Sequence, residues 1–463
     1  MMLIGGGVYV LLQLALSVWA ARRTRSETDY LLAGRSLGPF AVGMSIFATW
    51  FAVEGIVATS GVVAIEGVGG ALFDPLGLGL GLLLFALLVA GPLRRGRHVM
   101  LSGFLGSRFG RSTEVIAGLI VCASAIIWSS VQLLALAVLL VSLAEVSLFA
   151  ALLIATSLVL AYTLLGGLLG DIYTDVLQGI VLVVGLGLVL TAVAGFAGGL
   201  DAALAAIPAE RLAVRAPIEP LTSVEVFLAA LATSLASAEL AGRVLGARSV
   251  AAARGGALFG GVLYLAVGAM PVLLGLIGPE LGIDLPEGDD YLPAMVEALM
   301  PAWLHMIFIG ALLSAIFSTV DSALLAASAV ITETGYRSFR RNPTAREGLI
   351  VARATTVTAA LVAFFIAAGG DTVRTLAMQA ASVGGCLLVP VLAGVLTRSG
   401  GQLGAPASII GGFCLLFWLE WVREADGAFV YSIAGALLIY IGVESLRNVI
   451  GRLSAGPAPY PEA

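Results

Sequence analysis

Four oxygen-bearing side chains lie within five consecutive positions near the middle of a long apolar run: Ser318, Thr319, Asp321 and Ser322. On a helix, Ser318 and Ser322 share a face, because residues four apart are neighbours. Hard cations prefer several oxygen ligands, and we extend this rule from calcium and magnesium to sodium. The cluster therefore predicts a sodium site. The alternative is that the hydroxyls donate to the preceding helical turn, which does not explain an aspartate.

A second polar interruption lies at Glu54-Gly55, inside an apolar run that begins near residue 39. A charged side chain at membrane depth costs about 2.5–3.5 kcal/mol by insertion measurements, so a retained one is a candidate for function. A helix broken here frees backbone carbonyls and places half-helix termini at mid-depth, where transporters bind ions and polar solutes. The alternative is that Glu54 lies nearer the outer membrane interface.

The third polar segment runs from Gly166-Gly167 to Gln178 and contains Asp175. We expect the chain to turn at the cytoplasmic face here, with Asp175 one helical turn into the next span. Asp175 is then either part of a transport site or a partner for the positive end of a helix dipole. The deepest charged residues in the apolar runs are Glu54, Asp74, Asp175, Glu239, Asp321, Arg353 and Arg374.

The composition places these residues in a membrane. Hydrophobic residues make up 60% of the 463 and charged residues 11%, against about 45–50% and about 25% in soluble domains. Most of the surface must therefore face a lipid bilayer. A net charge of −5 without a basic stripe argues against nucleic acid as a partner. The three cysteines and two histidines are isolated, so they predict neither a disulfide framework nor a metal cluster.

A membrane helix needs about 20 apolar residues, and this rule predicts a single transmembrane domain over 1–463 with about thirteen spans. The predicted spans lie near 4–21, 39–64, 71–93, 113–143, 147–165, 172–194, 222–240, 255–277, 303–334, 348–368, 371–396, 404–422 and 428–446.

Arginine placement predicts the orientation, because cytoplasmic loops carry an excess of positive charge. Most of the 24 cationic residues fall in alternate predicted loops, for example Arg243, Arg248 and Arg254 after the seventh span. With thirteen spans, the N-terminus lies outside and the C-terminus in the cytoplasm. We therefore expect a multi-pass protein of the plasma (inner) membrane.

The polar segments, taken together, resemble the sodium:solute symporter family. The marks of that family follow in order: Asp29 to Arg35 after the first span, Gly166 to Gln178, Ser318 to Ser322, and Gly411-Gly412. The resemblance extends from about residue 25 to residue 415. Each motif is weak by itself, and the ordered set is specific.

This resemblance implies an all-α membrane protein with LeuT-like architecture. Two inverted five-helix repeats fall at about 39–194 and 222–396. One extra helix precedes them at about 4–21, and two follow at about 404–422 and 428–446. The resemblance also implies alternating access driven by sodium entry.

Carried over position by position, the family's common sodium site falls on three backbone carbonyls and two hydroxyls. The carbonyls belong to Ala48, Phe51 and Ala315, and the hydroxyls to Ser318 and Thr319. Family members that use a second sodium place it near Asp175, Asp321 and Ser322. The carboxylate at position 321 favours two ions over one.

Within the family, the chain is most similar to the high-affinity choline transporter branch. Trp50 and Trp128 suit an aromatic cage, in which a quaternary amine gains roughly 0.5–2 kcal/mol per ring. Leu78 and Ser237 stand where that branch has further aromatics, so half of the cage is missing. Asp74 and Glu54 could receive a cation directly, or they could orient a sugar or water. The alternative for Trp50 and Trp128 is that they only fill space in a helix interface. The predicted substrate residues are Trp50, Glu54, Asp74, Trp128 and Ser237.

The predicted function is sodium-coupled symport of a small organic solute, amine-bearing or zwitterionic. The alternatives are a sugar or monocarboxylate symporter, and a sensor that keeps the transporter fold. A sensor needs an output domain, and the sequence has 17 residues after its last predicted span. No nucleophile–base pair, His-Glu-x-x-His helix or phosphate loop indicates an enzyme, no ring of pore-lining polar residues indicates a channel, and nothing indicates an obligate protein partner.

Overall fold

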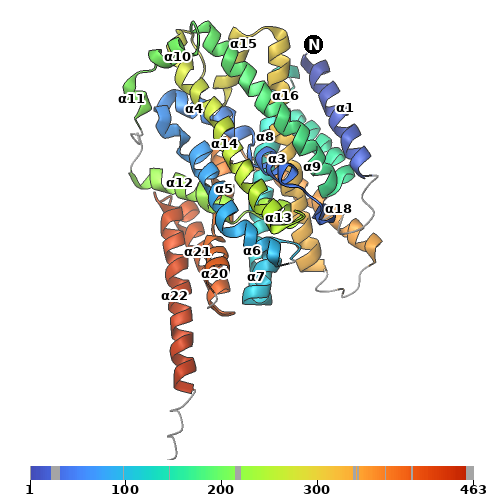
Figure 1. The fold of residues 1–463 in the computed structure, drawn as a ribbon, viewed down its shortest axis with the longest axis vertical. Helices are drawn as coiled ribbons and strands as arrows, with labels where there is room; N and C mark the ends of the chain where they lie inside the picture. Colours follow the sequence, from blue (N-terminus) through green and yellow to red (C-terminus); the bar gives the residue numbers. More distant parts are fainter. Residues whose placement is uncertain are drawn as a thin grey trace, which may run out of the picture.

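The computed structural model describes residues 2–21, 32–96, 98–144, 146–213, 220–336, 340, 344–370, 372–397 and 400–454. Within these ranges the regular structure is helical, and the β pairing is a single isolated bridge between Leu37 and Ala247. The helices form one bundle (Figure 1). The predicted all-α membrane architecture is confirmed, while the motif at 29–35 is described only from Leu32 onward.

The first half of the bundle contains both long helices and short 3-10 or π-helical pieces. Its elements are α1 (Met2–Ala21), η1 (Ala33–Arg35), α3 (Pro39–Trp50), η2 (Val53–Gly55), α4 (Val57–Glu66), η3 (Gly67–Ala71), η4 (Leu72–Gly77), α5 (Leu78–Leu84), η5 (Phe85–Val89), α6 (Ala90–Arg95), α7 (Leu101–Phe109), α8 (Arg111–Ala144), α9 (Leu148–Phe196), α10 (Leu200–Ala206) and α11 (Ala209–Leu212).

The second half begins after residue 219 and has the same mixture. Its elements are α12 (Pro220–Leu235), α13 (Ala238–Leu245), α14 (Val250–Ile277), η6 (Gly278–Leu281), η7 (Gly288–Asp290), α15 (Tyr291–Leu299), α16 (Ala302–Val330), η8 (Ile331–Tyr336), α18 (Ala345–Ala367), α19 (Val373–Gly385), α20 (Leu388–Leu396), α21 (Gly404–Phe417), η9 (Trp418–Val422) and α22 (Ala428–Ser454).

The predicted count of thirteen spans is not confirmed. Within the described ranges, nine helical stretches are long and apolar enough to cross a membrane, or ten if α19 and α20, bent by 41°, count as one. The apolar parts of α1 (Gly6–Leu16) and of the start of α9 (Leu148–Ala161) are shorter, as is α3. A single helix, α9, also covers two of the predicted spans, 147–165 and 172–194.

Two of the predicted spans contain a break in the helix. The helix α3 ends at Trp50, and Ala52 is extended (φ −88°, ψ −178°) before η2 and α4 resume. The break predicted near Glu54 is therefore present, and it begins at Phe51. A similar interruption separates α12 from α13 at residues 236 and 237, where Ser237 is extended (φ −68°, ψ 130°). These breaks free backbone groups inside the bundle.

Glycine allows α3 and α14 to approach closely. A Cβ atom on Gly256 would lie 2.7 Å from the Cβ of Val42, and one on Gly260 would lie 2.7 Å from the carbonyl oxygen of Gly43. Neither position has room for a side chain, so the two backbones pack directly, as small residues permit in membranes. This packing fixes the first broken helix against the bundle.

The ends of the described chain lie on opposite sides of the bundle. In Figure 1, α1 begins at the upper end, near the label N, while α22 extends beyond the other helices at the lower end.

Candidate functional site

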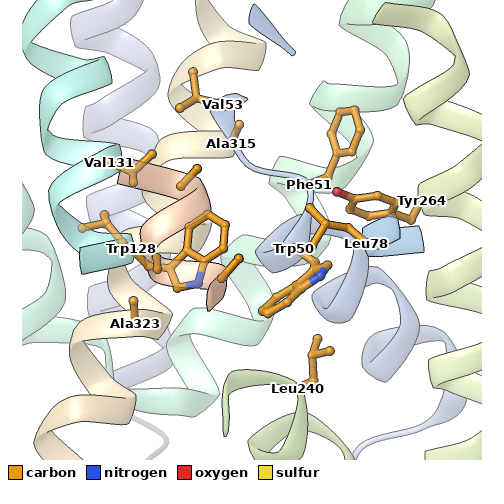
Figure 2. Close-up of a cluster of buried hydrophobic side chains, with 14 of the residues drawn as sticks. Trp50, Phe51, Val53, Leu78, Trp128, Val131, Leu240, Tyr264, Ala315 and Ala323 are labelled. Carbon is orange, nitrogen blue, oxygen red and sulfur yellow. The ribbon is translucent and has the colours of Figure 1, made fainter. Parts of the chain in front are cut away.

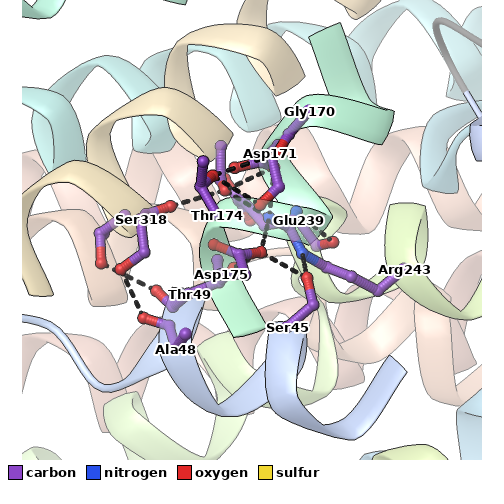
Figure 3. Close-up of polar contacts among 12 residues, drawn as sticks. Ser45, Ala48, Thr49, Gly170, Asp171, Thr174, Asp175, Glu239, Arg243 and Ser318 are labelled. Atoms are coloured by element: carbon purple, nitrogen blue, oxygen red, sulfur yellow. Dashed lines mark hydrogen bonds and ion pairs between the residues drawn. The ribbon is translucent and has the colours of Figure 1, made fainter. Parts of the chain in front are cut away.

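The C-terminal end of α3 meets the middle of α16 through two hydroxyl groups. Ser318 Oγ donates to the Ala48 carbonyl at 2.6 Å, and Thr319 Oγ1 donates to the Thr49 carbonyl at 2.9 Å. Both carbonyls belong to the last turn of α3, where carbonyls lose their intrahelical donors because the helix stops. Ser318 Oγ also lies 3.1 Å from the Ala315 carbonyl. Figure 3 shows Ser318 facing Ala48 and Thr49.

These contacts gather oxygen atoms of the kind that hard cations bind. Three of the five predicted sodium ligands, Ala48, Ala315 and Ser318, meet within hydrogen-bonding distance. Thr319 lies beside them and contacts Thr49. Phe51 is the first residue after α3, with φ −84° and ψ 75°, so its carbonyl leaves the helical direction.

A buried arginine, Arg243 on α13, lies next to this first cluster. Its Nη2 is 2.8 Å from Asp171 Oδ2 and 3.4 Å from Asp175 Oδ2, and it also donates to Ser322 Oγ. Ser45 Oγ donates to Asp175 Oδ2 at 2.5 Å. Figure 3 shows the guanidinium reaching between the acidic residues of α9 and Ser45 of α3. We call Asp171, Asp175, Arg243, Asp321 and Ser322 the acidic cluster.

The acidic cluster holds more negative than positive charge. Asp171, Asp175 and Asp321 are each at most 1% exposed, and Arg243 is their buried cation. Neither carboxylate oxygen of Asp321 has a hydrogen-bond partner in the described ranges. Burying a carboxylate without compensation is costly, so this cluster favours a further cation. The predicted second-sodium residues Asp175, Asp321 and Ser322 all belong to it.

The structure corrects two expectations about these residues. Arg243 was expected in a cytoplasmic loop, but it is 2% exposed and lies inside α13. Asp175 was expected one turn after a helix start, but α9 begins at Leu148. An interaction with the N-terminal end of the helix dipole therefore does not explain Asp175, because that effect is confined to the first turn.

A small cavity opens beside the break in α3. Two indoles form part of its wall, with the ring centroids of Trp50 and Trp128 6.2 Å apart. Figure 2 shows these rings facing the same space, near Leu78 and Ala323. The lining residues are Thr49, Trp50, Ala52, Glu54, Leu78, Trp128, Glu239, Thr319 and Ala323. This lining contains two carboxylates and no basic side chain.

Hydrogen bonds fix the polar groups of this cavity. Trp50 Nε1 donates to Ser234 Oγ at 2.9 Å, and Ser234 Oγ donates to the Leu78 carbonyl at 3.0 Å. Glu54 Oε2 accepts from Gln132 Nε2 at 3.0 Å. Glu54 is 3% exposed, so the protein encloses its side chain. Trp50 is thus held by its ring nitrogen, with its face left to the cavity.

Two of the predicted substrate residues do not line the cavity. Asp74 lies in η4, and a Cβ atom on Gly55 would be 2.6 Å from its Oδ2. Ser237 caps α13: its hydroxyl accepts from the Leu240 amide at 3.0 Å and donates to Glu239 Oε2 at 2.8 Å. Ser237 therefore orients Glu239, which does line the cavity.

Sequence reasoning did not assign a site role to Asp171, Arg243 or Glu239. Glu239 was identified as a deep charge. Ser237 followed by this acidic residue within one turn is a signal for the start of a helix. Asp171 lies inside a family motif without having been singled out. No local pattern distinguishes Arg243 from the arginines of a loop.

Comparison with known proteins identifies the family. A sequence model of the sodium:solute symporter family matches residues 30–412. The chain belongs to this family. As a sodium:solute symporter it is a multi-pass membrane protein that couples the movement of a small organic solute to Na⁺.

Two relatives found by sequence comparison are named as transporters of different solutes. The chain is 27% identical over 457 residues to the high-affinity proline transporter PutP of Bacillus subtilis, a match that covers 92% of this chain and 95% of that protein. It is 26% identical over 372 residues to the human high affinity choline transporter 1, covering 75% of this chain and 64% of that one.

Solved structures agree on the fold. A Na⁺-coupled sialic acid symporter, substrate-bound and outward-open, matches with a TM-score of 0.82 at 17% identity, over 96% of this chain and 98% of that one. A nucleobase-cation-symport-1 family transporter in a closed conformation matches with a TM-score of 0.60 at 16% identity, over 92% and 96%. The LeuT-like fold expected from the sequence is confirmed.

Proposed function

We propose that this symporter carries a small amine-bearing solute, cationic or zwitterionic, which binds between Trp50 and Trp128. The observation that carries the proposal is the lining of the cavity, which holds Glu54 and Glu239 and no basic side chain. An anionic solute meets two carboxylates at low dielectric, where repulsion is strong. A cationic amine meets those charges and two indole faces.

The relatives are consistent with this choice of solute class. Proline, named for one relative, is a zwitterion with an amine, and choline, named for another, is a quaternary amine. The cavity keeps two aromatic rings and adds carboxylates. Asp74 and Ser237 act on the solute indirectly in this proposal, through Glu54 and Glu239 respectively.

The sodium sites of the proposal are the two polar clusters beside the cavity. One sodium binds at the Ala48, Phe51 and Ala315 carbonyls with the Ser318 and Thr319 hydroxyls. A second binds near Asp175, Asp321 and Ser322. Thr319 belongs to the first site and also lines the solute cavity, which gives a direct route for coupling ion and solute binding.

The same proposal includes the topology. The inverted repeats are about 39–194 and 222–396, each beginning with a broken helix, α3–α4 and α12–α13. The N-terminus lies outside and the C-terminus in the cytoplasm of the plasma (inner) membrane.

Binding of a solute panel to the purified protein tests the solute class. We expect choline, betaine or proline to raise the melting temperature in sodium and not in potassium, and glucose, acetate and pyruvate to have no effect. Trp50→Ala should weaken that binding at least tenfold, while Trp303→Ala, on the exposed start of α16, should not. Sodium-dependent binding of acetate or pyruvate that is indifferent to Trp50 would reverse the proposal in favour of a monocarboxylate; glucose behaving so would favour a sugar.

A further inference from the structure

Asp74 is a buried carboxylate for which neither the sodium sites nor the solute cavity accounts. It is 2% exposed, and neither of its carboxylate oxygens has a hydrogen-bond partner in the described ranges. Its neighbours are Glu54 and Tyr264. The Tyr264 hydroxyl is also fully buried, and it faces Asp74. An ionised carboxylate in such surroundings is strongly disfavoured by the loss of hydration.

The two carboxylates cannot both be ionised at low cost. Glu54 and Asp74 are neighbours, because Thr59 Oγ1 lies 3.3 Å from the main-chain carbonyl oxygen of each, and Asp289 adds a further acidic group near Glu54. Like charges that share a buried site leave one of the groups protonated. Tyr264, from α14, is the other titratable group that faces Asp74, and it brings no positive charge.

Hydrogen bonding decides which carboxylate is neutral. Glu54 Oε2 accepts from the Gln132 amide at 3.0 Å, and a donor of this kind favours the charged form. Asp74 instead faces the Tyr264 hydroxyl, which can accept a hydrogen bond as well as donate one, so the proton fits on Asp74. The Tyr264 hydroxyl both donates and accepts, so it can serve Asp74 in either protonation state.

The packing favours a proton over a metal ion. A Cβ atom on Gly55 would lie 2.6 Å from Asp74 Oδ2, so the chain already fills that side of the carboxylate. The main-chain carbonyl of Asp74 accepts from Thr59 Oγ1 at 3.3 Å and is thereby occupied. A metal ion needs several oxygen ligands, whereas a proton needs one.

We propose that Glu54 and Asp74 hold one exchangeable proton, carried on Asp74, beside the solute cavity. The O–H bond forms at the Asp74 carboxylate, and water supplies and receives the proton. The proton keeps the charge of the pair at −1, so Glu54 can stay ionised and face the cavity. Its loss would place a second negative charge in the same buried space, which makes the charge of the cavity wall depend on pH.

Infrared spectroscopy of the protein reconstituted in lipid vesicles tests this site without any solute, so its outcome does not depend on the proposed transport substrate. A protonated carboxyl has a carbonyl stretch that a carboxylate lacks. We expect this band at pH 7 in the unmodified protein. It should disappear from the Asp74→Asn spectrum, and persist in Glu54→Gln and in Asp201→Asn, a control on the exposed surface of α10.

A second variant allows the proposal to be tested even if Asp74→Asn does not fold. Tyr264→Phe removes the hydroxyl that faces Asp74, and should shift the band without abolishing it. A band that is absent from the unmodified protein at pH 7, or unchanged in Asp74→Asn, overturns the proposal. A band lost in Glu54→Gln but kept in Asp74→Asn overturns the assignment to Asp74. A loss of bound ²²Na⁺ in Asp74→Asn with an unchanged band makes the site a sodium site.

Discussion

Ser318 and Thr319 each join two polypeptide segments that are far apart in sequence. Their hydroxyls donate to the carbonyls of Ala48 and Thr49, at the end of α3. A hydroxyl oxygen can turn its lone pairs toward a cation and release those carbonyls to the same cation. The hydrogen-bonded arrangement is therefore compatible with a sodium site, since the hydroxyl oxygens and the carbonyl oxygens can all turn lone pairs toward one ion while the segments stay together.

The double substitution Ser318→Ala with Thr319→Ala should abolish sodium-driven uptake while the protein still inserts. It removes two ligand oxygens and no charge, and the neighbouring carbonyls remain. We expect the sodium concentration for half-maximal thermal stabilisation to rise at least tenfold, which corresponds to about 1.4 kcal/mol. This concentration is measured by following the melting temperature while sodium is titrated.

Ser328→Ala is the matched control for that experiment. Ser328 lies further along α16, and its hydroxyl donates to the Ala352 carbonyl at 2.7 Å. The control should keep the sodium dependence of the unmodified protein. Unchanged sodium dependence in the double variant would mean that the first sodium site is wrongly assigned.

Arg243→Gln should destabilise the protein severely. It leaves Asp171 and Asp175 buried without their cation, and breaking a buried pair in this way typically costs about 3–5 kcal/mol. Adding Asp171→Asn to the same chain removes one of the stranded charges, so the melting temperature should recover in part. A single variant that melts like the unmodified protein would contradict the ion-pair geometry at 2.8 Å.

The acidic cluster shows what the sequence reveals at the scale of residues. Asp321 and its hydroxyl neighbours could be predicted as a site, because polar groups are conspicuous in an apolar run. Arg243 could not, because its burial depends on α13 packing against α3 and α9. Glu239 is similar: its depth is evident from the sequence, but its place on the cavity requires the break at residues 236 and 237.

At the scale of elements, helix identity and the break near Glu54 were predictable, and the break after Leu235 was not. Apolar length is sufficient to identify membrane helices, and the predicted positions of α8, α14, α16 and α22 all correspond to helices. The breaks after Trp50 and Leu235 lie in apolar sequence without proline. They depend on tertiary partners for the freed carbonyls, such as Thr319, and such partners are invisible to a sequence window.

A prediction at this scale concerns the contact between α4 and η7. A Cβ atom on Gly61 would lie 2.0 Å from the Gly288 carbonyl oxygen, so Gly61→Ala must push η7 away from α4. Overpacking of this kind typically costs about 1–3 kcal/mol. We expect amide hydrogen exchange across residues 286–291 to accelerate by about tenfold.

Gly255→Ala provides the comparison for this prediction. Gly255 lies in α14, where an added Cβ meets nothing within 4 Å. Exchange at 286–291 should remain as in the unmodified protein. Equal rates of amide hydrogen exchange at 286–291 in both variants would show that η7 does not pack directly against Gly61.

At the scale of the whole molecule, three polar sites converge on the broken helix α3–α4. The proposed first sodium site includes its Ala48 carbonyl, the acidic cluster contacts its Ser45, and the cavity is lined by Trp50 and Glu54. A movement of this one helix changes all three sites together. Alternating access in this fold moves repeat elements about a fixed site, so binding at one site biases the others through α3.

The charge balance of the molecule leads to a prediction of two sodium ions per transport cycle. Asp171, Asp175 and Asp321 share Arg243 as their buried cation, so the acidic cluster has an excess of negative charge, while the proposed Ser318 site offers only neutral oxygens. Equilibrium binding of ²²Na⁺ to purified protein should give two ions with a Hill coefficient above one. Asp321→Asn should reduce the count to one, and Asp201→Asn should leave it at two. One bound ion in the unmodified protein would contradict the prediction. The acidic cluster would then be neutralised by protons instead of a second sodium ion, and each transport cycle would move less sodium charge.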